Sequence, residues 1–262
     1  MREHVCIAPP LTHRSLACHA SYFLNSSVSD KQKLAPEARL GRRFAVLALS
    51  FAAILATGCG SSSSSKTGQL RFMQASPSAP HVDVLIDKVK QGSNLAYVNT
   101  TGYLTVKVGN LQLDAEPVNS TSPILSLSVP ITESGKTTVL MTGSSGNITS
   151  LSLTDGGTTS TTGDGYVRVV NASVSMGAAD VYIVPAGSGI SGVTPVATNL
   201  ALNQSAGYHL TPAGNYEVFM TSPGTSNVLL DSGPLNLASL ENWTFIALDG
   251  VAGGFSFTQL KD

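Results

Sequence analysis

An arginine and an aspartate recur at the same separation in two parts of the chain. Arg71 precedes Asp83, and Arg168 precedes Asp180, with the same number of residues between them. In a simple hairpin each pair would lie opposite on one face of a sheet, where unlike charges stabilise the pairing. The spacing predicts a structural cross-strand ion pair, with a ligand-binding pair used twice as the alternative.

The two histidines after Cys59, His81 and His209, are the candidates for acid–base chemistry. A Ser–His–Asp triad needs a nucleophile, a base and an orienting acid that meet in space. Ser76, His81 and Asp83 are so close along one predicted hairpin that a catalytic arrangement is disfavoured. We expect a protein that is not an enzyme, and the alternative is a hydrolase with its site in the loops near His81 and His209.

Asp155 and Asp164 flank a segment rich in threonine and glycine, at 154–165. Clustered oxygen ligands of this kind are what calcium prefers. We expect these carboxylates to be solvated parts of a linker, and we predict no metal site and no cofactor. A calcium-stiffened adhesin is the alternative.

Aromatic rings with a flat apolar face and a polar edge can stack on sugars. The candidates are Tyr97, Tyr103, Tyr166, Tyr182, Tyr208, Tyr216 and Trp243. Trp243 alternates with Phe245 as a buried strand face would, and the Gly-Tyr pairs at 102–103 and 207–208 are typical of a tyrosine that ties down a corner. We therefore expect core or corner positions for these rings.

Short segments of alternating apolar and polar residues must position all of these side chains. They lie at 70–72, 82–86, 103–108, 124–129, 137–141, 166–170, 180–184, 216–220, 228–230, 243–248 and 255–259, with Gly, Pro, Asn and Ser between them. Period-two segments separated by turn residues indicate an antiparallel β-sandwich. The sequence predicts an all-β protein with two tandem antiparallel β-sandwich domains, Ig-like or transthyretin-like.

An internal duplication gives the number of domains. Residues 70–76 align with 167–173, and without a gap 82–86 fall on 179–183. The strand-like segment TTVLMTG, which ends at Gly143, aligns with TFIALDG, which ends at Gly250. Each repeat is long enough to close its own core, which favours tandem domains over solenoid units. We predict domains at 69–153 and 166–262, joined by the linker 154–165; the second copy has gained a loop between Ile183 and Leu200.

The first repeat also carries a family resemblance. The segment RFMQASPSAPHVDVLID at 71–87, followed by a Gly-Tyr turn and a Gly-Asn turn, resembles the bacterial DUF4397 domain family of β-sandwich envelope proteins. The second copy, at 168–184, is the more divergent match because its loop lacks the prolines. The resemblance implies the fold, the duplication and an envelope location, and it supplies no catalytic or ligand residues.

Residues 40–58 have the order of a secretory signal. Arg42 and Arg43 precede an apolar stretch at 44–56 that is too short to span a membrane. The A-T-G-C ending resembles the lipobox of bacterial lipoproteins, which implies cleavage before Cys59 and diacylation of that cysteine. Two acyl chains anchor a protein stably. We predict a lipid anchor at Cys59 and a flexible serine-rich linker at 59–68.

Residues 1–39 precede a signal that normally begins a chain. We predict that this segment is translated from a start codon assigned too early, and a genuine N-terminal extension is the competing interpretation. In both cases the segment is removed with the signal and has no role in the mature protein. Gly60, in place of an aspartate after the lipidated cysteine, implies the outer membrane if the host is Gram-negative.

Charge and cysteine content restrict the remaining function classes. From Cys59 onward, eight lysines and arginines stand against thirteen acidic residues, so the net charge is −5. Nucleic acid binding requires a basic surface and is disfavoured. Cys59 is the only cysteine in this part, so an intramolecular disulfide is excluded. We expect a lipid-anchored cell-envelope protein with a non-catalytic structural or binding role toward a surface polysaccharide or another envelope protein.

Overall fold

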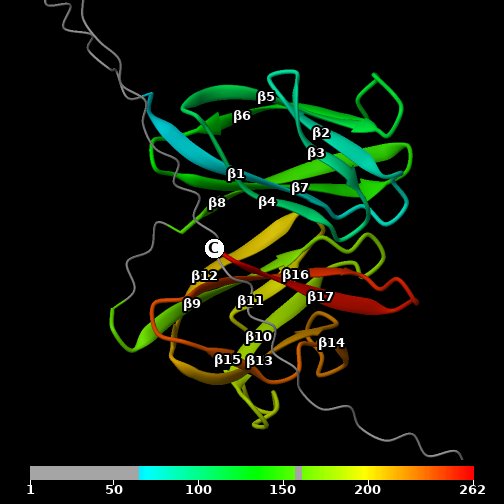
Figure 1. Cartoon of the computed structure of the whole chain (residues 1–262). Helices are drawn as coiled ribbons and strands as arrows, with labels where there is room; N and C mark the ends of the chain where they lie inside the picture. The colour runs from blue at the N-terminus through cyan, green and yellow to red at the C-terminus, as the bar shows by residue number, and fades with distance from the viewer. Residues whose placement is uncertain (1–64, 157–160) are drawn as a thin grey trace, which may run out of the picture. The chain divides into compact units, whose positions relative to one another are not determined.

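The computed structural model describes residues 65–156 and 161–262, whose regular elements are all β-strands (Figure 1). These residues belong to one compact unit. Within them there is no helix of the length and apolar character needed to cross a membrane. The segment 1–39, the signal at 40–58 and Cys59 lie outside the described residues, so the corresponding predictions stay predictions.

The N-terminal half, residues 67–155, contains eight strands. They are β1 (Thr67–Gln74), β2 (Val82–Ile86), β3 (Val89–Leu95), β4 (Thr100–Lys107), β5 (Gly109–Pro117), β6 (Leu125–Ile131), β7 (Lys136–Ser144) and β8 (Asn147–Asp155). One sheet has the order β4-β1-β7-β8 and the other has the order β3-β2-β5-β6. The chain crosses between the two sheets after β1, β3, β4 and β6, whereas β2–β3, β5–β6 and β7–β8 pair along the chain.

The C-terminal half, residues 164–261, contains nine strands. They are β9 (Asp164–Asn171), β10 (Ala179–Pro185), β11 (Ala197–Leu200), β12 (Gln204–Pro212), β13 (Gly214–Thr221), β14 (Val228–Asp231), β15 (Leu235–Leu237), β16 (Asn242–Asp249) and β17 (Phe255–Lys261). Their sheets have the orders β12-β9-β16-β17 and β11-β10-β13-β14, with β15 also paired to β13. Strand for strand this repeats the topology of the N-terminal half, so the duplication seen in the sequence extends to the connectivity.

The sheets are mixed, and the prediction of purely antiparallel pairing is wrong at two places. β1 runs parallel to β7 with Arg71 opposite Thr138, and β9 runs parallel to β16 with Arg168 opposite Thr244. No hairpin joins the strands of either pair, so nothing forces them to be antiparallel. Thr138 is thus the structural counterpart of Thr244, one residue away from the Thr137 of the sequence alignment.

Each half has an apolar core built from both of its sheets, which is consistent with β-sandwiches. In the N-terminal half the core contains Leu70, Phe72, Val82, Val84, Ile86, Leu113, Val129, Val139 and Met141. In the C-terminal half it contains Val167, Val169, Val181, Val218, Met220, Phe245 and Ala247. The alternating side chains that predicted the strands are the ones that point into these cores. The two-domain boundaries and the Ig-like or transthyretin-like assignment stay predictions.

A third apolar cluster contains residues from both halves. The N-terminal half contributes Met73, Ala75, Leu140 and Leu153, and the C-terminal half contributes Val170, Ala172, Ile246, Leu248 and Leu260. These side chains are out of phase with those of the two cores, so the central strands β1, β7, β9 and β16 are buried on both faces. The near-continuous apolar runs of these strands follow from this double burial.

The shared cluster predicts that the two halves unfold together. Leu140→Ala removes a fully buried side chain from it and should cost about 2–5 kcal/mol of unfolding free energy. Urea unfolding of residues 60–262, followed by the fluorescence of Trp243 and by circular dichroism, should give one transition that shifts as a whole. Val251→Ala, at a side chain that is 93% exposed, is the control. Two separate transitions, of which only one responds, would contradict the shared cluster.

Candidate functional site

The repeated arginines and aspartates do not meet as the sequence suggested. β1 and β2 lie in different sheets, so Arg71 cannot lie opposite Asp83 in a hairpin. The same holds for Arg168 on β9 and Asp180 on β10. The prediction is wrong because the segment after each arginine-bearing strand crosses to the other sheet instead of turning back.

Each arginine instead binds an aspartate of the other half. Arg71 Nη2 donates to Asp262 Oδ1 at 2.6 Å, and Arg168 Nη2 donates to Asp155 Oδ1. Asp155 ends β8 and Asp262 follows β17, so both carboxylates come from equivalent places in the repeat. The Nη1 atoms donate to the carbonyl oxygens of the preceding residues, Lys261 at 3.0 Å and Thr154 at 2.9 Å. The result is a reciprocal exchange of ion pairs between the halves.

A threonine and a tyrosine fix the arginine and aspartate inside the N-terminal half. Arg71 Nε donates to Thr138 Oγ1 at 2.8 Å, and the Thr138 hydroxyl donates to Asp155. The Tyr103 hydroxyl donates to the same carboxylate at 2.9 Å. The guanidinium carbon of Arg71 lies 4.3 Å from the centre of the Tyr103 ring, a cation–π contact. Arg71 is therefore held on several sides before it reaches across to Asp262.

The C-terminal half repeats this arrangement. Arg168 Nε donates to Thr244 Oγ1 at 2.9 Å, and the hydroxyls of Thr244 and Tyr208 both donate to Asp262. The Arg168 guanidinium lies 4.4 Å from the centre of the Tyr208 ring. We call these eight residues the arginine–aspartate network: Arg71, Tyr103, Thr138, Asp155, Arg168, Tyr208, Thr244 and Asp262.

A bulge next to each tyrosine aims its ring at the arginine. The register of β4 against β1 shifts beside Tyr103, and that of β12 against β9 shifts beside Tyr208. The preceding residues, Gly102 and Gly207, have φ of 68° and 77°, a left-handed conformation that glycine adopts without strain. The Gly-Tyr pairs thus belong to strand bulges and not to the corners predicted from the sequence.

The network is buried and electrically balanced. Arg71 and Arg168 are 4% and 3% exposed, and the side chains of Asp155 and Asp262 are fully buried. Buried charges are tolerated when each has a partner and its remaining donors are satisfied. Burial, reinforced by the Asp155 charge, raises the pKa of Tyr103 far above its usual value, so its hydroxyl stays a donor. These groups are occupied by one another.

Asp83 and Asp180 perform a different, equally repeated task. Asp83 accepts from the Asn94 backbone N–H at 2.9 Å and pairs with Lys90; Asp180 accepts from the Asn199 N–H at 2.9 Å. The Lys90 ammonium, followed by the Asn94 amide, lowers the pKa of Asp83. Asn94 and Asn199 both have φ of 53°, which asparagine tolerates better than most residues. Each aspartate therefore fixes a left-handed residue beside the edge strand β3 or β11.

The linker carboxylates also differ from expectation. Asp155 is not solvated but belongs to the network, and Asp164 accepts from the Thr161 hydroxyl at 2.7 Å at the start of β9. Among residues 65–156 and 161–262 there is no group of three or more His, Cys, Asp or Glu side chains placed to hold a metal ion.

The two candidate histidines bind neutral partners. His81 Nδ1 lies 3.0 Å from Asn94 Oδ1, and His209 Nε2 lies 3.0 Å from the Ala206 carbonyl oxygen. Ser76 is buried and donates to the Gly143 carbonyl at 2.7 Å. None of the side chains of Ser76, His81 and Asp83 hydrogen-bonds to another of the three, so they do not form a relay.

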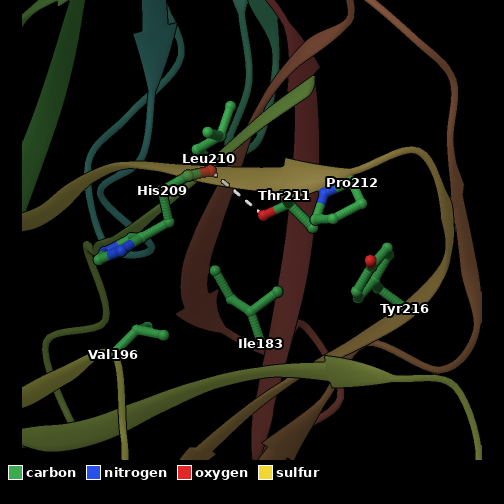
Figure 2. A pocket seen from close by; sticks show the side chains of 7 residues that line it. All are labelled: Ile183, Val196, His209, Leu210, Thr211, Pro212 and Tyr216. Carbon is green, nitrogen blue, oxygen red and sulfur yellow. Dashed lines mark hydrogen bonds between the residues drawn. The ribbon is translucent and has the colours of Figure 1, made fainter. Parts of the chain in front are cut away.

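An open hollow of about 250 Å³ lies beside His209 (Figure 2). It is lined by Ile183 of β10, His209, Leu210, Thr211 and Pro212 of β12, Tyr216 of β13, and Val196. In Figure 2 the side chains of His209, Ile183, Val196 and Tyr216 face one space below β12, and the Leu210 side chain points to the other side of that strand. The sequence pointed to His209 and Tyr216 separately but gave no signal that they share a site.

Comparison with known families gives one match. Residues 68–182 match the model of the family described as "Domain of unknown function (DUF4397)". The match supports the DUF4397 domain family for this segment. It covers almost all of the N-terminal half together with β9 and most of β10, so it extends past the boundary between the halves. No curated protein matches the chain.

Two solved structures are distantly similar. One is the Bacillus anthracis TIE protein, at 10% identity and a TM-score of 0.22, over 75% of this chain and 44% of that chain. The other is a family CBM26 module from Eubacterium rectale Amy13K in complex with maltoheptaose, at 8% identity and a TM-score of 0.23, over 75% of this chain and 97% of that chain. This chain thus spans less than half the length of the TIE protein. Scores this low carry no inference about function.

Removal of one network carboxylate should be strongly destabilising. Asp155→Asn removes the buried carboxylate to which Arg168 donates and should cost about 3–5 kcal/mol of unfolding free energy. The matched control is Glu133→Gln, which breaks an exposed pair with Lys66 and should cost less than about 1 kcal/mol. Urea unfolding of residues 60–262 measures both. Equal effects of the two substitutions would contradict the structural role of the network.

The buried tyrosines predict a loss of stability at alkaline pH. Burial, followed by the Asp249 charge, raises the pKa of Tyr97 to about 12, and burial also raises the pKa values of Tyr103 and Tyr208. Above the usual tyrosine pKa of about 10 the unfolded chain ionises and the folded chain does not, so stability falls as the pH rises further. Denaturant unfolding between about pH 9 and pH 12 should show this fall in the free energy of unfolding. Tyr208→Phe should make the pH dependence shallower. A slope unchanged in Tyr208→Phe would contradict the assignment.

Proposed function

We propose that the mature chain is a lipid-anchored cell-envelope protein with a non-catalytic binding role toward a surface polysaccharide or another envelope protein. The observation that carries the non-catalytic role is the use of the repeated charged residues. Arg71 and Arg168 hydrogen-bond to other residues of the network. Asp83 and Asp180 accept hydrogen bonds from backbone N–H groups of the edge strands β3 and β11. The repeated charged side chains therefore bind other parts of the protein and stabilise its fold.

A binding role agrees with the contacts that join the two halves. The two halves share a buried apolar cluster and a balanced ionic network, so they present their outer surfaces as one body. A preorganised body loses little conformational entropy when it binds a partner. The hollow beside His209 offers a concave surface with both apolar and polar side chains, which is the usual character of a ligand site.

The envelope location is supported by the leader sequence. Two arginines, a short apolar run, small residues and Cys59 occur in the order of a lipoprotein signal. The serine-rich segment that follows would separate the anchor from the folded body by a flexible tether.

The anchor is tested by Cys59→Ser expressed in a bacterial host. The wild-type protein should sediment with membranes, whereas the variant should be recovered in the soluble fraction because it cannot be acylated. Mass spectrometry of the purified wild-type protein should show an acylated N-terminal cysteine. Continued membrane association of the variant, or an unmodified wild-type chain that starts at Met1, would contradict the lipid anchor.

The binding role is tested with residues 60–262 on an array of surface polysaccharides and envelope proteins. Retention of a component without chemical change is expected. Cleavage of an arrayed component, abolished by His81→Ala or His209→Ala, would instead favour the hydrolase alternative. A melting temperature raised by calcium and lowered again by chelation would favour the adhesin alternative.

A further inference from the structure

The hollow beside His209 has a counterpart at the same position of the N-terminal half. That second hollow, of about 300 Å³, is lined by Ile86, Asp87, Val89, Gln91, Thr105, Val106, Lys107 and Leu111. We call the two the C-terminal hollow and the N-terminal hollow. The N-terminal hollow lies between β4 of one sheet and β2, β3 and β5 of the other. The C-terminal hollow lies between β12 of one sheet and β10 and β13 of the other.

Strand register makes the residues of the two hollows directly comparable. Tyr103 and Tyr208 each pair with the network arginine of their own half, so Leu104 corresponds to His209 and Lys107 to Pro212. Val84 pairs with Ala115, and Val181 pairs with Met220. It follows that Ile86 corresponds to Ile183, and Leu111 corresponds to Tyr216.

The floor of the C-terminal hollow is the more exposed of the two. Ile86 and Leu111 are only 6% and 7% exposed, whereas Ile183 and Tyr216 are half-buried. The cause is the edge strand. β3 has seven residues and follows β2 down to Ile86, but β11 has four residues, and its pairing with β10 stops at Val181. Ile183 therefore pairs with Val218 of β13 on one side and has the loop at 186–196, and no strand, on the other.

The lining of the C-terminal hollow suits a neutral, amphipathic ring. It contains no Lys, Arg, Asp or Glu side chain. Ile183, Pro212 and the Tyr216 ring supply apolar surface. The polar groups are the Tyr216 hydroxyl and the His209 imidazole, whose Nε2 lies 3.0 Å from the Ala206 carbonyl oxygen, whereas the buried Thr211 hydroxyl donates to the His209 carbonyl oxygen at 3.2 Å. A pyranose has apolar C–H faces and a rim of hydroxyls, which matches aromatic and hydroxyl-bearing side chains placed together. The volume of about 250 Å³ is that of a small site, enough for a sugar ring or two.

The fold does not require these residues. At the equivalent positions the N-terminal half has Leu104, Lys107 and Leu111, of which Lys107 and Leu111 line its hollow. The same arrangement of strands thus forms in the N-terminal half without the tyrosine and the histidine of the C-terminal hollow. The N-terminal hollow also places Lys107 and Asp87 at its rim, which would disfavour an uncharged ligand.

We infer that the C-terminal hollow binds a neutral hexose unit of a polysaccharide and that the N-terminal hollow does not. This site assignment rests on the proposed binding role and gives it a location and a ligand class. One chain then carries one saccharide site, in spite of its internal duplication.

The test uses residues 60–262 and neutral oligosaccharides built from glucose, galactose, mannose or N-acetylglucosamine. Calorimetry should give one site per chain for at least one of these probes. Tyr216→Leu and His209→Leu introduce the type of residue that the other half already has, so the fold should persist. Each should weaken binding by about tenfold or more, which corresponds to about 1.4 kcal/mol. Val89→Ala, in the N-terminal hollow, is the matched control and should bind like the wild type.

Three outcomes would overturn the assignment. They are no binding of any of the probes at millimolar concentration, binding that Tyr216→Leu and His209→Leu leave unchanged, and two sites per chain. Unfolding midpoints of the variants, measured in urea, separate a loss of binding from a loss of fold. Capture of an envelope protein or an acidic polysaccharide without neutral saccharide binding would refute this site and leave the general binding role standing.

Discussion

The structure depends on a reciprocal exchange of buried charges. Arg71 donates to Asp262 and Arg168 to Asp155, while the aspartate of the same half lies farther from each guanidinium, at 3.7 Å for Arg71 and Asp155 and 3.5 Å for Arg168 and Asp262. An isolated half would keep only the longer of the two contacts of its arginine and lose the direct hydrogen bond to the carboxylate of the other half. The apolar cluster around Leu140 provides the area of contact between the halves, and the exchange fixes which residues must face one another. The repeat retains arginine, threonine, tyrosine and aspartate together because each depends on the other three.

This constraint also separates architecture from function. Charged residues that recur in both halves act in the network or in the edge strands, so recurrence in this chain marks structural need. The positions where the halves differ are the informative ones. His209 and Tyr216 stand where the N-terminal half has Leu104 and Leu111, and the edge strand β11 beside the C-terminal hollow is shorter than β3. The C-terminal hollow therefore differs from the N-terminal hollow although the two halves share one topology.

The sequence predicted the strands and the duplication because period-two burial and turn residues are local signals. It could not predict the partners of Arg71, because Asp262 lies at the other end of the chain and contact between them depends on how two sheets stack. The hairpin assumption failed because β1 and β2 belong to different sheets. The inserted loop after Ile183 was visible in the sequence, but its effect was not, since the exposure of Ile183 depends on where β11 stops.

A double-mutant cycle between Arg71 and Asp262 tests the exchange most directly. Arg71→Met, Asp262→Leu and the double variant would be compared with the wild type by urea unfolding of residues 60–262. Each single variant should lose about 3–5 kcal/mol, and the double variant should lose clearly less than their sum, because removing both partners leaves no unpaired charge at that pair. Losses that add to within about 0.5 kcal/mol would contradict a buried ion pair between the two halves.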